Sequence, residues 1–205
     1  MRARWDDRGF DLFKVMRSPK HEKILLASTS PRRKKILGFC NIPFKVIPPR
    51  GVEEKQRSGE DPAQLSMRLA LEKAISVSRQ HPDQLVIGAD TIVVFEDEVF
   101  GKPVNPMVAK KMLLNLSGRS HQVMTGIALV QKGGKLKRMH VEISKVTFKK
   151  ISVQLIEAYL KTKEPYDKAG GYDIQGTAGK WIKRIQGDYL NIVGLPINWL
   201  FQQIN

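Results

Sequence analysis

One apolar run, LVIGADTIVVF at residues 85–95, constrains the fold more than any other part of the chain. It is rich in β-branched residues, which is typical of a strand buried on both faces of a sheet. Asp90 is its one charged residue. A carboxylate there costs free energy unless it is paired, binds a metal or lies at the end of the strand. Asp90 is therefore a general base or metal ligand, or else it caps a turn beside Thr91; composition does not decide between these readings.

Helices and strands are expected to alternate along the chain, which indicates an α/β protein with a mixed, twisted sheet and flanking helices. The polar stretch 50–62 is expected to be an exposed loop, and GDYLNIVGLP at 187–196 a turn followed by a buried strand. Gly133-Gly134 is expected to join two strands. The expected strands are 24–27, 44–47, 85–95, 121–130 and 139–149, and the expected helices are 31–39, 63–80, 107–116, 152–162 and the tail from Pro196.

The stretch ILLASTSPRRKKIL at 24–37 places cations directly after a buried strand. Ser30 is a suitable N-cap and Pro31 suits the first helical position. Arg32 and Arg33 then fall in the first turn, where the helix dipole disfavours positive charge and attracts anions. A phosphate held by the two guanidinium groups accounts for this placement. Lys34 and Lys35, by contrast, are expected to lie on a solvated face.

Three further charged residues, Glu54, Lys73 and Lys102, could serve a phosphate site or be ordinary surface groups. The glycine-rich segment 167–176, DKAGGYDIQG, would allow a ligand to approach the backbone closely, although it does not match the Walker A pattern. Carboxylates beside a phosphate site favour Mg²⁺ or Mn²⁺, because both ions prefer oxygen ligands.

The chain has a formal net charge of +15, which favours an anionic partner: nucleic acid, anionic lipid or a phosphorylated small molecule. No apolar run approaches the roughly 20 residues that a membrane helix needs. The single cysteine, Cys40, rules out an intramolecular disulfide and fits a reducing compartment. We therefore expect a cytoplasmic protein without a membrane partner.

Several segments together resemble the Maf family of nucleoside triphosphate pyrophosphatases. They are LASTSPRRKKIL, EEK, RLALEKA, GADTIVV, GKP, LSGRSHQVMTGIAL, DKAGGYDIQG and GDYLNIVGLP, which occur in the family's order and spacing over about residues 24–200. The resemblance implies one domain over 23–205, elongated and two-lobed with a central cleft, related to inosine triphosphate pyrophosphatases. Residues 1–22 would be an N-terminal extension.

The resemblance also implies a house-cleaning reaction, hydrolysis of a nucleoside triphosphate to the monophosphate and pyrophosphate with a divalent cation, often by a homodimer. The segment 167–176 is similar to the dTTP/UTP branch, although Asp173 stands where small residues are commoner. By matching position, Asp90 would be the catalytic base and Glu54 would help Asp90 to hold the metal. Substrate-binding roles, including specificity, are implied for Ser28, Arg32, Arg33, Lys73, Thr91, Lys102 and Gln175.

A rival hypothesis is a nucleic-acid-binding or cell-division regulator without catalysis, since Maf-like proteins are associated with septum inhibition and the basic charge would suit nucleic acid. Its binding would weaken steeply with salt and would not require Asp90. The sequence contains no recognisable nucleic-acid module, and only 7% of its residues are aromatic. The enzyme is therefore the favoured hypothesis, and nucleic acid is not the expected partner.

Overall fold

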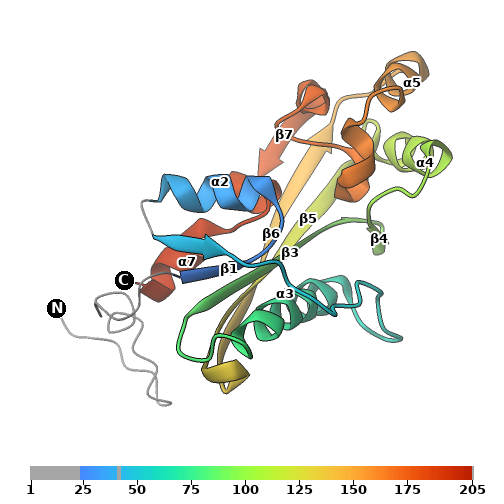
Figure 1. Ribbon diagram of the computed structural model, residues 1–205. Coiled ribbons are helices and arrows are strands. Elements are labelled where there is room, and N and C mark those ends of the chain that lie inside the picture. Colours follow the sequence, from blue (N-terminus) through green and yellow to red (C-terminus); the bar gives the residue numbers. More distant parts are fainter. Residues whose placement is uncertain (1–23, 41–42, 205) are drawn as a thin grey trace.

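The computed structural model describes residues 24–40 and 43–204, so the expected N-terminal extension lies outside the described residues (Figure 1). The described chain is a mixed sheet flanked by helices, as expected. The strands are β1 (Ile24–Ala27), β2 (Phe44–Val46), β3 (Val86–Phe95), β4 (Glu98–Phe100), β5 (Ser120–Gln131), β6 (Leu136–Phe148) and β7 (Ile182–Gln186). The helices are α2 (Pro31–Phe39), α3 (Pro62–Ser78), α4 (Pro106–Leu116), α5 (Val153–Leu160), α6 (Tyr189–Val193) and α7 (Ile197–Ile204).

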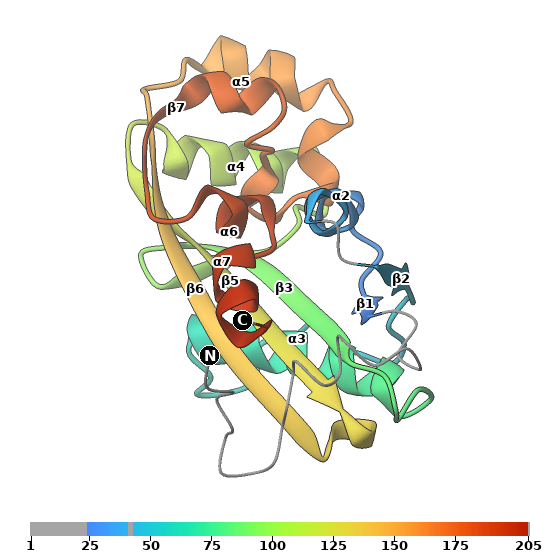
Figure 2. The ribbon, with the colours of Figure 1, turned by 90° about the vertical axis from the view of Figure 1, so that its left-hand side faces the viewer.

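The sheet has the strand order β2-β1-β3-β5-β6-β7, with β4 paired to the carboxyl-terminal end of β3. Strand β1 runs parallel to β2 and β3, whereas the remaining pairs are antiparallel. The long strands β3, β5 and β6 extend through the molecule, with α4, α5 and β7 gathered at one end (Figure 1). Helix α3 covers one face of the sheet, and α6 and α7 lie on the other (Figure 2). The buried run 85–95 is therefore the central strand that its composition predicts.

One expectation about local structure was wrong. Residues 189–193 form helix α6, not a buried strand. The helix begins because the Asp188 carboxylate accepts a hydrogen bond from the backbone N–H of Leu190, and it ends at Gly194, whose φ is 121°. Both signals were present in GDYLNIVGLP, but the apolar residues between them resemble a strand as much as one helical turn.

Helix α3 lies unusually close to the sheet, because two glycines face it. A Cβ atom added to Gly88 would lie 2.1 Å from the carbonyl oxygen of Ala70, and one added to Gly126 would lie 2.1 Å from that of Ser66. Gly126 is the partner of Asp90 across the β3–β5 ladder. Gly88 lies two residues before Asp90, so both residues point to the same face of β3. Because neither glycine has a side chain, α3 packs directly over Asp90.

Two apolar clusters fill the space between α3 and the sheet, one around Ala70 and Ala74 and the other around Leu65 and Leu69. A larger cluster lies on the opposite face and at the α4–α5 end, where Phe148 is the largest fully buried side chain. Among the described residues, no helix is long and apolar enough to cross a membrane.

A histidine lies within this larger core. The His121 ring is 3% exposed, and its Nε2 atom is 2.7 Å from the hydroxyl oxygen of Tyr172. Its Nδ1 atom is buried with no hydrogen-bond partner in the described part of the chain. Burial lowers the pKa of His121 to about 4 and raises that of Tyr172 above its usual range. The ring is therefore neutral at pH 7.

The close helix contact gives a first prediction. Gly126→Ala places a methyl group against the backbone of α3, and we expect it to lower the free energy of unfolding by about 1–3 kcal/mol or more. Urea titration of the purified protein measures this change. Gly38→Ala is the matched control: an added Cβ meets nothing within 4 Å there, so the variant should be neutral or slightly stabilised. Equal effects of the two substitutions would contradict the close contact.

The buried histidine gives a second prediction. The unfolded chain takes up a proton at this ring near pH 6.5, whereas the folded chain does so only near pH 4. The stability that the neutral ring contributes is fully present above pH 6.5 and is lost as the pH falls towards 4, by on the order of 3 kcal/mol in total.

Urea titrations between pH 7 and 4.5 measure this slope. His121→Gln removes the titrating group but keeps a hydrogen-bonding side chain, so stability in that variant should depend less on pH. His81→Gln, in the turn after α3, should keep the slope. An unchanged slope in His121→Gln would contradict the assignment.

Candidate active site

A cleft of about 730 Å³ lies along β3 and is lined by residues of α3 and of α6, which cover opposite faces of the sheet. Its walls come from segments that are far apart in the chain: the start of α2, the loop before α3, helix α3, strand β3 and the glycine-rich segment after α5. The expected site residues Ser28, Arg32, Arg33, Glu54, Lys73, Asp90, Thr91 and Lys102 all line it. Gln175 does not; its side chain is exposed and outside the lining. Its role in specificity stays a prediction.

Asp90 lies in the middle of β3 and is 8% exposed. It is not at the end of its own strand. The neighbouring strand β1 ends at Ala27, which pairs with Gly88, so Asp90 lies just past the carboxyl end of β1. Ligands commonly bind in the crevice beyond the carboxyl ends of the strands in α/β sheets. The composition of the run 85–95 could not reveal this offset.

Lys73 joins two carboxylates in the cleft. Its ammonium nitrogen lies 2.5 Å from Asp90 Oδ1 and 2.7 Å from Glu54 Oε1. The Lys73 and Asp90 side chains are each 11% exposed, whereas that of Glu54 is 58% exposed. Two buried opposite charges compensate each other, and removing either one would leave the other unpaired. The hydrogen bond from Lys73 lowers the pKa of Glu54, and burial opposes that shift.

The periodicity of α3 explains why Lys73 faces the cleft. Leu65, Leu69 and Lys73 recur at four-residue spacing, and all three line the cleft. The helix begins with a complete capping box, in which the Asp61 carboxylate accepts from the N–H of Gln64 and the Gln64 side chain accepts from the N–H of Asp61. Its position along the sheet is set by the glycine contacts. Lys73 therefore reaches Asp90 from a rigid element.

The start of α2 confirms the expected cap. The Ser30 hydroxyl accepts a hydrogen bond from the N–H of Arg33, and Pro31 occupies the first turn. The Ser28 hydroxyl in turn accepts from the N–H of Ser30. First-turn N–H groups and arginines therefore border the cleft, and this arrangement favours an anion.

The Arg33 guanidinium makes more protein contacts than the sequence suggests. It donates to the carbonyl oxygen of Gly194 at 2.8 Å, to Thr91 Oγ1 at 2.9 Å and to Ser28 Oγ at 3.4 Å. All three acceptors are uncharged, so none of them neutralises the cation. Burial lowers the pKa of Arg33, while the nearby Asp90 charge opposes that shift. Arginine still stays charged in proteins, so Arg33 both braces the cleft and keeps its attraction for anions.

A chain of hydroxyl groups continues from Arg33 into the core. Thr91 Oγ1 accepts from Arg33, so its own proton is free to go to Thr125 Oγ1, 3.0 Å away. Thr125 then donates to the backbone carbonyl of Asn191 at 2.8 Å. The Asn191 amide donates to the carbonyl of Val123 and to Ser144 Oγ. The sequence did not identify Thr125 and Asn191 as supporting residues of the site, because their hydrogen bonds depend on how α6 packs against β5.

At the opposite rim, Arg32 forms an ion pair of 3.1 Å with Asp173, and Lys168 Nζ lies 3.9 Å from the other oxygen of that carboxylate. Asp173 also accepts a hydrogen bond from the N–H of Gln175. Lys102 lines the cleft and forms no hydrogen bond or ion pair within the described part of the chain. Its positive charge still lowers the pKa of Glu54.

The donor atoms suit Mg²⁺ or Mn²⁺ in part. Only one oxygen of Asp90 and one of Glu54 bonds Lys73, so each carboxylate has a second oxygen that could bind a hard cation. No group of three His, Cys, Asp or Glu residues within 24–40 and 43–204 could hold a metal ion. A site of this kind needs ligands from the substrate, and phosphate oxygens are the usual ones.

A second hollow of about 830 Å³ lies between the end of α4 and the end of β6. Its lining includes Lys149, Lys150 and Lys183 but no carboxylate. It has no side chain of the kind that activates water, so the chemistry points to the first cleft.

The family comparison and the sequence comparison agree with each other. The model of the "Maf-like protein" family matches residues 23–205. The chain is 50% identical over 177 residues to a "dTTP/UTP pyrophosphatase" of Clostridioides difficile, covering 86% of this chain and 91% of that protein. It is 44% identical over 182 residues to a protein of the same name from Bacillus cereus, covering 89% and 94%. A Ham1 protein of Staphylococcus aureus resembles it over 62% of this chain and 71% of that one, with 14% identity and a TM-score of 0.46.

Proposed function

This chain belongs to the Maf-like protein family, and we propose on that basis that it hydrolyses dTTP and UTP to the nucleoside monophosphate and pyrophosphate. The observation that carries the reaction type is the pairing of Asp90 with Lys73 at the bottom of a cleft bordered by cations. Hydrolysis of a phosphoanhydride needs a positioned water and compensation of the triphosphate charge. This cleft offers side chains for both tasks.

Asp90 is the general base in this proposal. Its Oδ1 atom is held by Lys73, and Oδ2 has two lone pairs, one for a proton of the attacking water and one for the divalent cation. The water oxygen forms a new bond to the α-phosphorus. The bond between that phosphorus and the α–β bridging oxygen breaks, and pyrophosphate leaves with the bridging oxygen. Because Lys73 sits on a helix fixed by glycine contacts, the carboxylate does not have to reorganise during the reaction.

The cations of the cleft compensate the charge of the substrate. Arg33 and the start of α2 provide fixed donors on one side. Lys102 is exposed and unpaired within the described residues, so it can move to a phosphate oxygen at little cost. Arg32 is already paired with Asp173, so a phosphate that binds Arg32 has to compete with that carboxylate.

A divalent cation, Mg²⁺ or Mn²⁺, would be held by Asp90 and Glu54 together with phosphate oxygens of the substrate. When bound, it supplies positive charge to the phosphates that are being separated. The second oxygens of the two carboxylates support this proposal. A homodimer, which the family resemblance implies, stays a prediction that sedimentation of the purified protein can check.

The function gives a third prediction. We expect pyrophosphate release from dTTP and UTP in the presence of Mg²⁺ or Mn²⁺, with kcat/KM at least about 10-fold above the values for CTP and GTP. The measurement is a pyrophosphate assay across the four nucleotides, repeated with EDTA, which should abolish the reaction because the proposed metal has few protein ligands.

Activity that favours CTP or GTP would keep the reaction but contradict the assignment of substrates. Release of inorganic phosphate and a diphosphate would contradict cleavage between the α and β phosphates. A folded protein that is inactive with every nucleotide and both metals would overturn the proposed function. Salt-sensitive binding to nucleic acid would then favour the rival hypothesis.

A further inference from the structure

The loop between β2 and α3 carries Glu54 and is not anchored by regular structure. Over residues 48–59, the only backbone–backbone hydrogen bond among the described residues joins the N–H of Glu60 to the carbonyl of Arg57. Val52 packs against the apolar cluster under α3. Every other fixed contact of the loop uses a side chain. The side-chain contacts of the loop therefore determine where Glu54 lies.

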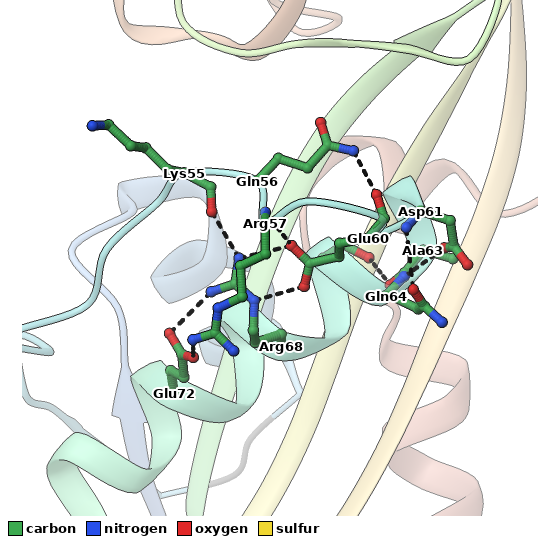
Figure 3. Close-up of polar contacts among 10 residues, drawn as sticks. Lys55, Gln56, Arg57, Glu60, Asp61, Ala63, Gln64, Arg68 and Glu72 are labelled. Atoms are coloured by element: carbon green, nitrogen blue, oxygen red, sulfur yellow. Dashed lines mark hydrogen bonds and ion pairs between the residues drawn. The ribbon is translucent and has the colours of Figure 1, made fainter.

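Arg68, on α3, holds this loop at several points at once (Figure 3). Its Nε and Nη2 atoms donate to the two oxygens of Glu60 at 2.6 and 2.9 Å, which is a bidentate fork. Nη2 also donates to the backbone carbonyl of Lys55 at 2.8 Å, and Nη1 donates to Glu72 at 3.2 Å. The carbonyl of Lys55 is only one residue beyond Glu54. Arg68 therefore fixes the backbone next to the metal-binding candidate.

This cluster is more than a solvated ion pair. The side chains of Arg68 and Glu60 are only 13% and 10% exposed, and the fork lowers the pKa of Glu60 to about 2. The same Glu60 carboxylate accepts from the N–H of Arg57, and the Glu60 carbonyl accepts from Gln56. These contacts join residues of the loop to one another and to α3. Ion pairs that are exposed to solvent usually contribute much less to stability.

Helix α3 presents two adjacent rows of side chains, one to the loop and one to the cleft. Arg68 and Glu72 contact the loop, and Leu69 and Lys73, each one position later in the sequence, line the cleft. Glu54 then returns from the loop to Lys73. We propose, resting on the function proposed above, that Arg68 is a positioning residue: it holds Glu54 against Lys73 and so prepares the carboxylate pair for the metal and the substrate.

The experiment compares Arg68→Gln, Glu54→Gln and the double variant in the full chain. Arg68→Gln should lower kcat by about 10- to 100-fold and raise the metal concentration for half-maximal rate, with little change in KM. The double variant should be no slower than Glu54→Gln alone, because both substitutions remove the same arrangement. Arg68→Lys keeps the charge but not the fork, so it should fall between Arg68→Gln and wild type, and it replaces Arg68→Gln if that variant does not fold.

Arg57→Gln is the matched control. It removes another cation of the same cluster, but the Arg57 side chain is 65% exposed and contacts only Glu72. Its kcat and metal dependence should stay close to those of wild type. A purely structural role for Arg68 would instead lower the stability of Arg68→Gln and leave its kcat unchanged.

A second readout does not depend on activity. Trypsin cleaves after lysine and arginine, and Lys55 and Arg57 both have exposed side chains in the loop. Under native conditions, Arg68→Gln should be cut at these positions at least about 10-fold faster than wild type, because a released loop enters a protease more easily.

Three results would overturn the proposal: a wild-type kcat in a folded Arg68→Gln, a wild-type cleavage rate in that variant, or fully additive losses in the double variant. Wild type that hydrolyses no nucleotide would overturn the proposed function instead, and the trypsin readout would still decide whether Arg68 holds the loop.

Discussion

The close contact between α3 and the central strands is the constraint on which the rest of the site depends. It requires glycine at positions 88 and 126, since a side chain at either would meet the helix backbone. The same contact brings Lys73 within 2.5 Å of Asp90, which is otherwise an expensive charge in an apolar strand. The two glycines, the lysine and the aspartate therefore form one structural unit. The buried carboxylate is tolerated because the helix that pairs with it cannot move away.

A second unit joins the opposite wall of the cleft to the core. Arg33 binds Gly194 and Thr91, and Thr91 leads through Thr125 to Asn191. This chain of donors and acceptors ties the start of α2 to α6, although the two segments are separated by more than 150 positions in the sequence. The side of the cleft that carries Arg33 is thus supported by hydrogen bonds, as the carboxylate side is supported by α3. Rigid support on both sides is what a site needs to stabilise a transition state without reorganising.

Local patterns predicted much of this structure from the sequence. The buried strand at 85–95 and the Ser30 cap with Pro31 follow from rules that act within a few residues. Long-range contacts were harder. Nothing in the sequence shows that Arg33 would bind Gly194, or that Asp90 lies where β1 ends and not at the end of its own strand. Helix α6 was taken for a strand because one helical turn is too short to show a period. Arg68 lies within RLALEKA, but its hold on Glu60 and Lys55 depends on how the loop folds back.

In the proposed reaction, Asp90 activates water for cleavage of a nucleoside triphosphate. The direct measurement is the kcat of pyrophosphate release from dTTP by wild type and Asp90→Asn at saturating metal, with the fold of both proteins checked by circular dichroism. We expect kcat to fall by about 10²-fold or more in an Asp90→Asn variant that remains folded. Near-normal turnover by Asp90→Asn would mean that Asp90 is not the base, and another group of the cleft would have to accept the proton.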